Sequence, residues 1–74
     1  MYHAVIASFP TQSLADEFLS KVDRNLYQQA GSVARDGKVR VYAGKFDNRE
    51  QAESYILSLR THAQYKDAWL FISR

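Results

Sequence analysis

The chain has 74 residues, of which ten are Lys or Arg, eight are Asp or Glu, and none is Cys. This length allows one domain with one modest core, and the lack of Cys excludes disulfides and thiolate metal sites. A net charge of +2 falls short of the clustered basic stripe that binds nucleic-acid phosphates strongly. No apolar run approaches the roughly 20 residues that span a bilayer.

The first half of the chain predicts a strand, a helix and a second strand. Residues 2–9 (YHAVIASF) are rich in strand formers, and Thr11 after Pro10 is a candidate helix N-cap. Apolar residues then recur at helical spacing, at Ala15, Phe18, Leu19 and Val22. Residues 27–35 (YQQAGSVAR) predict a weaker strand.

The second half predicts the same order of elements. Asp36-Gly37 is a hairpin signal that leads into the alternating strand 38–46 (KVRVYAGKF). Asp47 is the predicted cap of the next helix, with Glu50 completing a capping box. The apolar positions Ala52, Tyr55, Ile56 and Leu59 follow, and residues 67–73 (DAWLFIS) predict a final strand.

The two halves also resemble each other in sequence. Five residues of the first half recur in kind 37 positions later: Phe9, Ala15, Phe18, Leu19 and Val22 match Phe46, Ala52, Tyr55, Ile56 and Leu59. A duplicated βαβ unit predicts an α+β, ferredoxin-like βαββαβ fold, with a four-stranded, mainly antiparallel sheet and two helices on one face. We expect the first and third strands to be central and parallel to each other.

The alternation of side chains assigns residues to the helix-free face of this sheet. A two-residue turn at Asp36-Gly37 pairs Arg35 with Lys38 and Val33 with Arg40. If the alternating apolar residues face the helices, with Ala68, Leu70 and Ile72 inward in the last strand, the other face carries aromatic and basic groups. These are His3, Val5, Gly31, Val33, Arg35, Lys38, Arg40, Tyr42, Trp69 and Phe71. Burial of Trp69 and Phe71 as ordinary core residues remains an alternative.

No catalytic pattern is present in the sequence. His3 and His62 lack the paired spacing of a metal site, Ser8 lies in no nucleophile elbow, and there is no glycine-rich phosphate loop. The acidic residues of the helices lie off the apolar stripes, which is typical of a solvated surface. We therefore expect a non-enzymatic protein without metal or other cofactor.

The sequence resembles the SPOR domain, a peptidoglycan-binding family, over essentially its whole length. The second half carries the specific part of the resemblance, in this order: Arg40-Val41, Gly44, Phe46, Arg49-Glu50, Ala52 and Leu59-Arg60. The first strand matches more loosely. Where the family often has Gln-x-Gly-Ser-Phe, this chain has Val5, Ala7, Ser8 and Phe9.

The resemblance implies a module of the bacterial cell envelope that binds peptidoglycan glycan strands, above all strands stripped of stem peptides at the division septum. On this view residues 1–74 form one domain of a longer periplasmic or envelope protein, whose parent chain is membrane-anchored although this domain itself does not contact the membrane. The expected glycan-binding residues are Arg40, Tyr42, Trp69, Phe71, Arg35, Val5 and Ser8. Aromatic rings suit the C–H faces of sugars, and arginines suit their carboxylates.

Two other functions fit the same fold and surface. A protein-binding module would also present apolar residues rimmed by charge. An RNA-recognition module would use sheet-face aromatics, but the stretch 38–46 has a single aromatic before Gly44 and lacks the RNA signature. Nucleic acid is therefore not the expected partner.

Overall fold

Six main elements alternate along the chain as strand, helix, strand, strand, helix, strand. In the computed structural model, which describes residues 1–73, they are β1 (Tyr2–Phe9), α1 (Gln12–Leu19), β2 (Gly31–Arg35), β3 (Lys38–Phe46), α2 (Arg49–Leu59) and β4 (Trp69–Ile72). A short 3₁₀ helix (Ala63–Tyr65) precedes β4. The predicted α+β, ferredoxin-like fold is confirmed.

The four strands form one sheet in the order β2-β3-β1-β4. The first and third strands are central, as predicted, but they pair antiparallel, and the prediction that they run parallel was wrong. Helix α1 returns the chain to its starting end, so that β2 runs in the same direction as β1. The β2–β3 hairpin then reverses the chain, and β3 inserts between β1 and β2 antiparallel to both.

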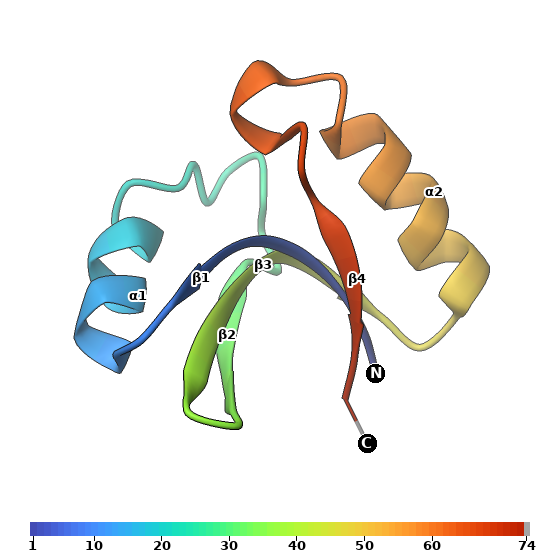
Figure 1. Cartoon of the computed structure of the whole chain (residues 1–74). Helices are drawn as coiled ribbons and strands as arrows, with labels where there is room; N and C mark the ends of the chain where they lie inside the picture. The colour runs from blue at the N-terminus through green and yellow to red at the C-terminus, as the bar shows by residue number, and fades with distance from the viewer. Residues whose placement is uncertain (74) are drawn as a thin grey trace.

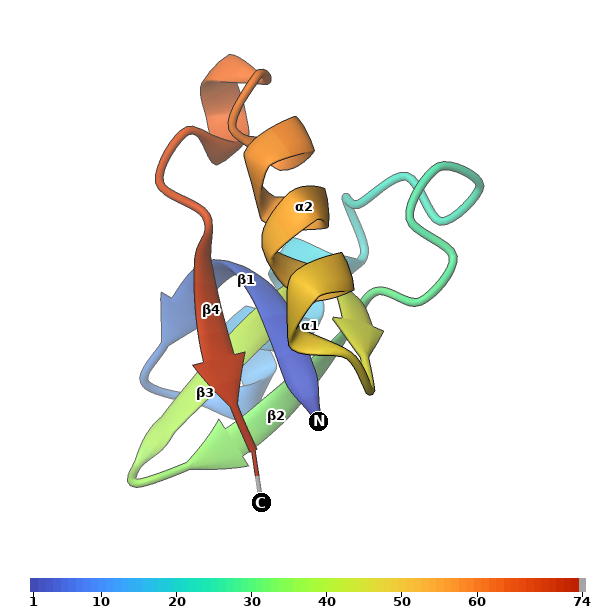
Figure 2. The same ribbon diagram turned by 90° about the vertical axis from the view of Figure 1, so that its right-hand side faces the viewer.

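Both helices pack on the same face of the sheet. Ile56 and Leu59 of α2 share a core cluster with Ala4 of β1 and Ala43 of β3, and Phe18 and Leu19 of α1 pack against the same cluster. Figure 1 shows the sheet bent, with the β2–β3 hairpin and β4 descending on either side and the helices on the outer surface. Figure 2, turned by 90°, shows α2 lying across β1 and β3.

The hairpin turn has the predicted geometry. Asp36 and Gly37 have φ values of 55° and 75°, the left-handed conformation that a two-residue type I′ turn requires. The resulting register pairs Arg35 with Lys38, Val33 with Arg40, and Gly31 with Tyr42. The predicted face assignment of these two strands is therefore confirmed.

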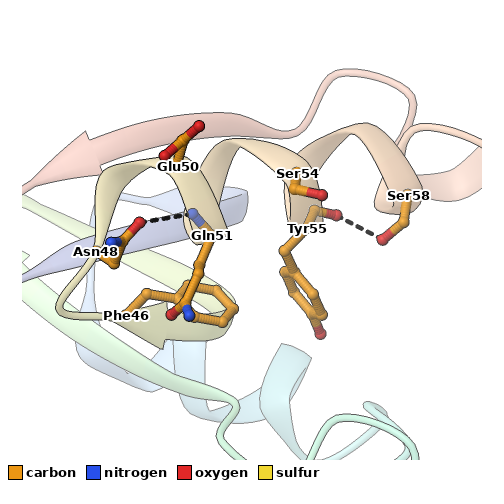
Figure 3. A pocket seen from close by; sticks show the side chains of 7 residues that line it. All are labelled: Phe46, Asn48, Glu50, Gln51, Ser54, Tyr55 and Ser58. Atoms are coloured by element: carbon orange, nitrogen blue, oxygen red, sulfur yellow. Dashed lines mark hydrogen bonds between the residues drawn. The ribbon is translucent and has the colours of Figure 1, made fainter.

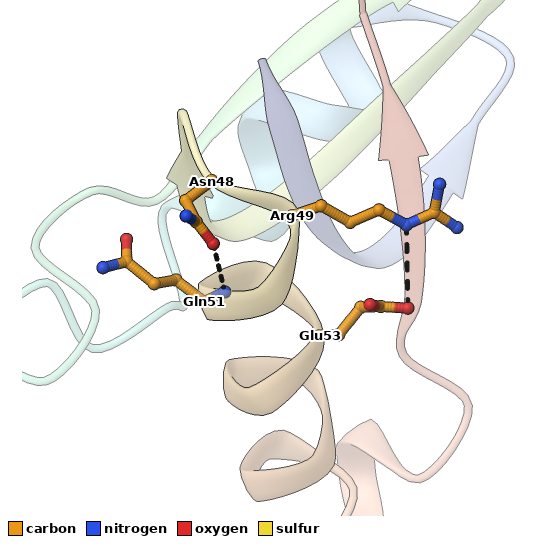
Figure 4. Close-up of polar contacts among 4 residues, drawn as sticks. All are labelled: Asn48, Arg49, Gln51 and Glu53. Atoms are coloured by element: carbon orange, nitrogen blue, oxygen red, sulfur yellow. Dashed lines mark hydrogen bonds and ion pairs between the residues drawn. The ribbon is translucent and has the colours of Figure 1, made fainter.

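Each helix is capped by a side chain at its N-terminus. The Thr11 hydroxyl accepts a hydrogen bond from Leu14 N, as predicted. The cap of α2 is Asn48, not Asp47, because β3 continues to Phe46 and the helix begins at Arg49. Asn48 Oδ1 accepts from Gln51 N (Figure 4), and Glu50 makes no capping box. The exposed Arg49–Glu53 pair in the same view, at 3.7 Å, adds little stability.

Three elements are shorter than predicted. The segment 27–30 is a turn, because Asp23 Oδ1 accepts hydrogen bonds from the backbone of Asn25 and Leu26 and curls the chain before β2. Helix α1 ends at Leu19, although Val22 is still buried in the core. Strand β4 begins at Trp69, and Ile72 at its end is 41% exposed, so its assignment to the core was wrong.

Candidate functional site

The register of the sheet brings the seven expected site residues to its helix-free side, which we call the concave face. Arg40 lies opposite Ser8 of β1, and Tyr42 lies opposite Val5. On the other side of β1, Trp69 pairs with Val5, and Phe71 pairs with His3. The residues on this face are His3, Val5, Ser8, Gly31, Val33, Arg35, Lys38, Arg40, Tyr42, Lys45, Trp69 and Phe71.

A bulge in β1 explains how Val5 and Ser8 share this face. Strict alternation would send two residues three positions apart to opposite faces. In the structure the register shifts between Val5 and Ala7, and Ile6 is left without a partner on β3. The shift rotates the remainder of the strand, so that Ser8 comes to lie opposite Arg40.

Arg40 extends across the concave face. Its guanidinium carbon lies 4.5 Å from the centre of the Phe71 ring and 5.7 Å from that of Trp69. On the other side, Arg40 Nη1 donates to the carbonyl of Arg35 at 3.3 Å. From β3 the side chain therefore contacts β2 on one side and reaches over β1 to β4 on the other, and the two cation–π contacts favour this position by about 0.5–2 kcal/mol.

The centre of the concave face is more closed than the sequence predicts. Tyr42 is only 9% exposed and Val5 is 0% exposed, so neither of these two expected glycan-binding residues is a solvent-exposed side chain, although both lie on the helix-free face. The Tyr42 ring lies over Gly31 of β2, where an added Cβ would stand 2.6 Å from the Tyr42 hydroxyl oxygen. The ring centre of His3 lies 4.7 Å away on the other side. Neighbouring side chains thus bury this ring on the sheet surface.

Trp69 lies at the accessible side of the face. Its side chain is 39% exposed, and its ring packs edge-on against Phe71 at 6.1 Å. The alternative that Trp69 is an ordinary core residue is therefore wrong. Ser8 and Arg35 are also exposed, whereas Phe71 and Arg40 are half-buried.

Two buried nitrogens on the concave face have no hydrogen-bond partner. They are His3 Nδ1 and Arg40 Nε, and no other buried side-chain nitrogen or oxygen of residues 1–73 lacks one. An unsatisfied buried polar atom costs about 1–3 kcal/mol of folding free energy. Such an atom therefore marks a place where packing or binding outweighs this cost. Burial also lowers the pKa of His3. An interaction with the Phe71 backbone opposes this shift, and the N-terminal ammonium and Lys45 add smaller lowering contributions.

A comparison with protein-family models shows the family of this chain. The SPOR domain model matches residues 1–71 of the 74. The chain belongs to the SPOR domain family. Its members are peptidoglycan-binding modules of bacterial cell-envelope and division proteins. Neither the comparison with curated proteins nor that with solved structures gives a significant match.

The charged side chains of this SPOR domain lie mostly on its surface. Residues 1–73 hold no group of three or more His, Asp or Glu side chains that could bind a metal ion. The helix residues Asp16, Glu17, Glu50 and Glu53 are all exposed. Within the same range, no helix has both the length and the apolar character needed to cross a membrane. The arrangement fits the binding role of the family.

Sequence reasoning missed one surface of this SPOR domain. Phe46 of β3 and Tyr55 of α2 form an aromatic pair, with ring centres 5.2 Å apart, beside an open pocket of about 720 Å³ on the helix side. Both residues belong to the 37-residue repeat, from which the sequence predicts only an apolar helix position at Tyr55 and a strand and family-motif residue at Phe46. The sequence feature that indicates this surface is a row of uncharged polar residues on the side of α2 that carries Tyr55, namely Gln51, Ser54 and Ser58.

Proposed function

We propose that the concave face binds peptidoglycan glycan strands from which the stem peptides have been removed. The observation that carries this proposal is Arg40, whose guanidinium stacks over Phe71 and Trp69 while its buried Nε has no acceptor. Because Nε is covered in the free domain, a bound ligand would bring an oxygen to it by displacing the neighbouring side chains. A charge-assisted hydrogen bond of this kind is about twice as strong as a neutral one.

The charges of the concave face favour a stripped strand over an intact one. Four cationic side chains lie on this face, namely Arg35, Lys38, Arg40 and Lys45, and none of its residues is acidic. Removal of a stem peptide converts an amide of the sugar's lactyl group into a carboxylate. The strand itself thus gains a carboxylate, while the peptide leaves with its own charged groups and its bulk. A carboxylate held directly on the strand can reach the cationic side chains of this face.

The aromatic residues have different roles in this proposal. Trp69 is exposed and can stack against the C–H face of a sugar ring, because the face of its π system is electronegative. Tyr42 and Val5 are buried, and Val5 lies between Tyr42 and Trp69 across the strands. Ser8 and Arg35 extend the contact surface toward the β2–β3 hairpin.

Recognition of stripped glycan would direct a parent protein to the division septum. Stripped strands arise where cell-wall amidases separate daughter cells, so a domain that binds them needs no protein partner to find this place. In this proposal residues 1–74 act as the periplasmic targeting domain of a longer envelope protein.

Co-sedimentation with purified sacculi tests the proposal. We expect more protein in the pellet after amidase treatment than with intact sacculi. Equal amounts in both pellets would refute selectivity for stripped strands. Tight binding to RNA at physiological salt would instead support the nucleic-acid alternative.

A pair of substitutions on β4 tests the site itself. Trp69→Ala removes the exposed ring and should weaken binding by about 1–3 kcal/mol, if stacking on bases is a guide for sugars. Ile72→Ala is the matched control, because Ile72 is similarly exposed but lies opposite Tyr2, outside the concave face. Unchanged binding by a folded Trp69→Ala variant would exclude this face as the site.

A further inference from the structure

A second surface with binding-site character lies on the helix side, around Phe46 and Tyr55. The open pocket of about 720 Å³ beside these two rings is lined by Asn48, Glu50, Gln51, Ser54 and Ser58 (Figure 3). A smaller pocket of about 250 Å³ shares both rings and reaches to Gln28 and Gln29. We call this joint surface the Phe46–Tyr55 trough. Its main pocket is shallow and open to solvent, so a ligand would lie on the two rings and the polar side chains without being enclosed.

The trough is polar but nearly uncharged. Its amide side chains come from Gln28, Gln29, Asn48 and Gln51, and no Lys or Arg lines it. Glu50 is its one charged lining residue. This composition contrasts with the four cations of the concave face and disfavours an anionic ligand.

Much of the hydrogen-bonding capacity in the trough is unused within the described residues. Asn48 Oδ1 accepts from Gln51 N, and Ser58 Oγ donates to the carbonyl of Tyr55 (Figure 3). The side-chain amide of Gln51 and the hydroxyl of Ser54 make no hydrogen bond within residues 1–73. Amides and hydroxyls both donate and accept, as do the groups of an uncharged sugar.

Gly44 holds the aromatic pair close to the sheet. A Cβ at this position would stand 3.0 Å from a Tyr55 ring carbon and 3.4 Å from the Phe46 ring. The glycine therefore allows both rings to lie over the end of β3. The Tyr55 hydroxyl is protonated at neutral pH, as in any tyrosine, and can donate a hydrogen bond. Burial raises its pKa further.

The first half of the chain provides an internal comparison. Phe9 and Phe18, 37 positions before Phe46 and Tyr55, form the same kind of ring pair at 5.4 Å. The pair itself is therefore a structural feature of both halves. The polar lining is not, because the positions equivalent to Gln51, Ser54 and Ser58 are Leu14, Glu17 and Lys21. Folding of a βαβ half does not require the uncharged polar row.

We propose that the Phe46–Tyr55 trough is a second carbohydrate site, which takes an uncharged N-acetylated hexosamine. The ring pair offers an apolar surface to a sugar face and to the acetyl methyl group, and the side-chain amides match the acetamido group. The inference rests on the proposed function for the class of ligand, because peptidoglycan strands contain such sugars. Together with the concave face, the trough would allow one domain to contact two glycan segments and gain avidity.

Titration of the folded domain with tri-N-acetylchitotriose, an uncharged oligomer of this sugar, tests the inference. In two-dimensional amide NMR spectra we expect shifts at Gly44, Gln51 and Ser54, and none at Arg40 or the Trp69 indole. Shifts confined to the concave face, or no shifts at millimolar sugar, would overturn the second site. Neither result would bear on whether stripped sacculi bind, so the two proposals fail separately.

Two exchanges between the halves give matched variants. Gln51→Leu with Ser54→Glu installs the residues that the chain itself carries at positions 14 and 17, and both sites are exposed. We expect chitotriose affinity to fall at least about tenfold. The reverse exchange, Leu14→Gln with Glu17→Ser, should leave it unchanged. Undiminished binding by the first variant would refute the proposal.

Discussion

The two βαβ halves of this SPOR domain share a scaffold and differ in the surface built on it. Thr11 and Asn48, 37 positions apart, cap their helices through the same side-chain contact to the backbone nitrogen three residues on. Ala15 and Ala52 are both 0% exposed, where each helix packs against the rest of the fold. The two buried nitrogens without a hydrogen-bond partner also belong to equivalent residues of the halves, because His3 and Arg40 are 37 positions apart.

The difference between the halves lies in residues that the repeat does not constrain. Helix α1 has eight residues and α2 has eleven, and the second half carries the uncharged row of the Phe46–Tyr55 trough. On the concave face, Val5 of the first half occupies the position of Tyr42 in the second. The core positions under the helices are apolar in both halves, whereas the exposed side of α2 and the buried centre of the concave face differ between them.

The largest effect should come from the central residue of the concave face. Tyr42→Ala removes a buried ring and should lower the free energy of unfolding by about 3–5 kcal/mol, in the range of other buried aromatic truncations. Val5→Ala at the equivalent position removes fewer atoms and should cost less. Urea unfolding of both variants checks the order, and a Tyr42→Ala variant as stable as the native domain would show that the ring is not packed as described.

Overpacking beneath the helices tests whether the halves are structurally equivalent. Ala15→Leu and Ala52→Leu each place a larger side chain where the native residue is fully buried. Each should cost about 1–3 kcal/mol, because neighbouring groups must move to make room. Thermal unfolding of the two variants gives the comparison. If only one variant were destabilised, the packing of the two helices would not be equivalent.

Removal of the N-caps should have a smaller effect. Thr11→Ala and Asn48→Ala each delete the side-chain acceptor at the start of a helix and should cost about 1 kcal/mol. Asp47→Ala is the control, because Asp47 precedes the cap and its loss should change stability little. A larger loss from Asp47→Ala than from Asn48→Ala would place the helix start one residue earlier.

The smallest expected effect is a pH dependence that arises from His3. Burial lowers its pKa, so the folded domain favours neutral His3, while the unfolded chain takes up the proton near the usual value of about 6.5. The free energy of unfolding should therefore decrease as the pH falls through about 6.5 and recover above it. Urea unfolding at about pH 7.5 and pH 5.5 measures the change. His3→Gln should reduce it, and His62→Gln, on the exposed connection before β4, should not.

Local signals in the sequence were sufficient for much of the fold. Strand 2–9, the Asp36-Gly37 turn with its register, the Thr11 cap and the βαββαβ order were all predicted correctly. These features depend on residues close together in the sequence, on backbone conformations that few residue types adopt, or on a strict repeat of two residues in strands and 3.6 in helices. The cap of α2 was misplaced by one residue, because Asp47 and Asn48 are equally good caps and only the end of β3 selects between them.

The closure of the concave face was decided by tertiary structure. The sequence determined that two βαβ halves exist, and which side chains alternate along each strand. It also determined the direction of β3, because α1 returns β2 parallel to β1 and the hairpin then reverses the chain, so the prediction of parallel central strands did not follow from its own element order. Alternation did not show that Tyr42 would be buried, since its burial comes from Gly31 and His3 on two other strands. A strand's own pattern states which way a side chain points, and only the neighbouring strands determine what covers it.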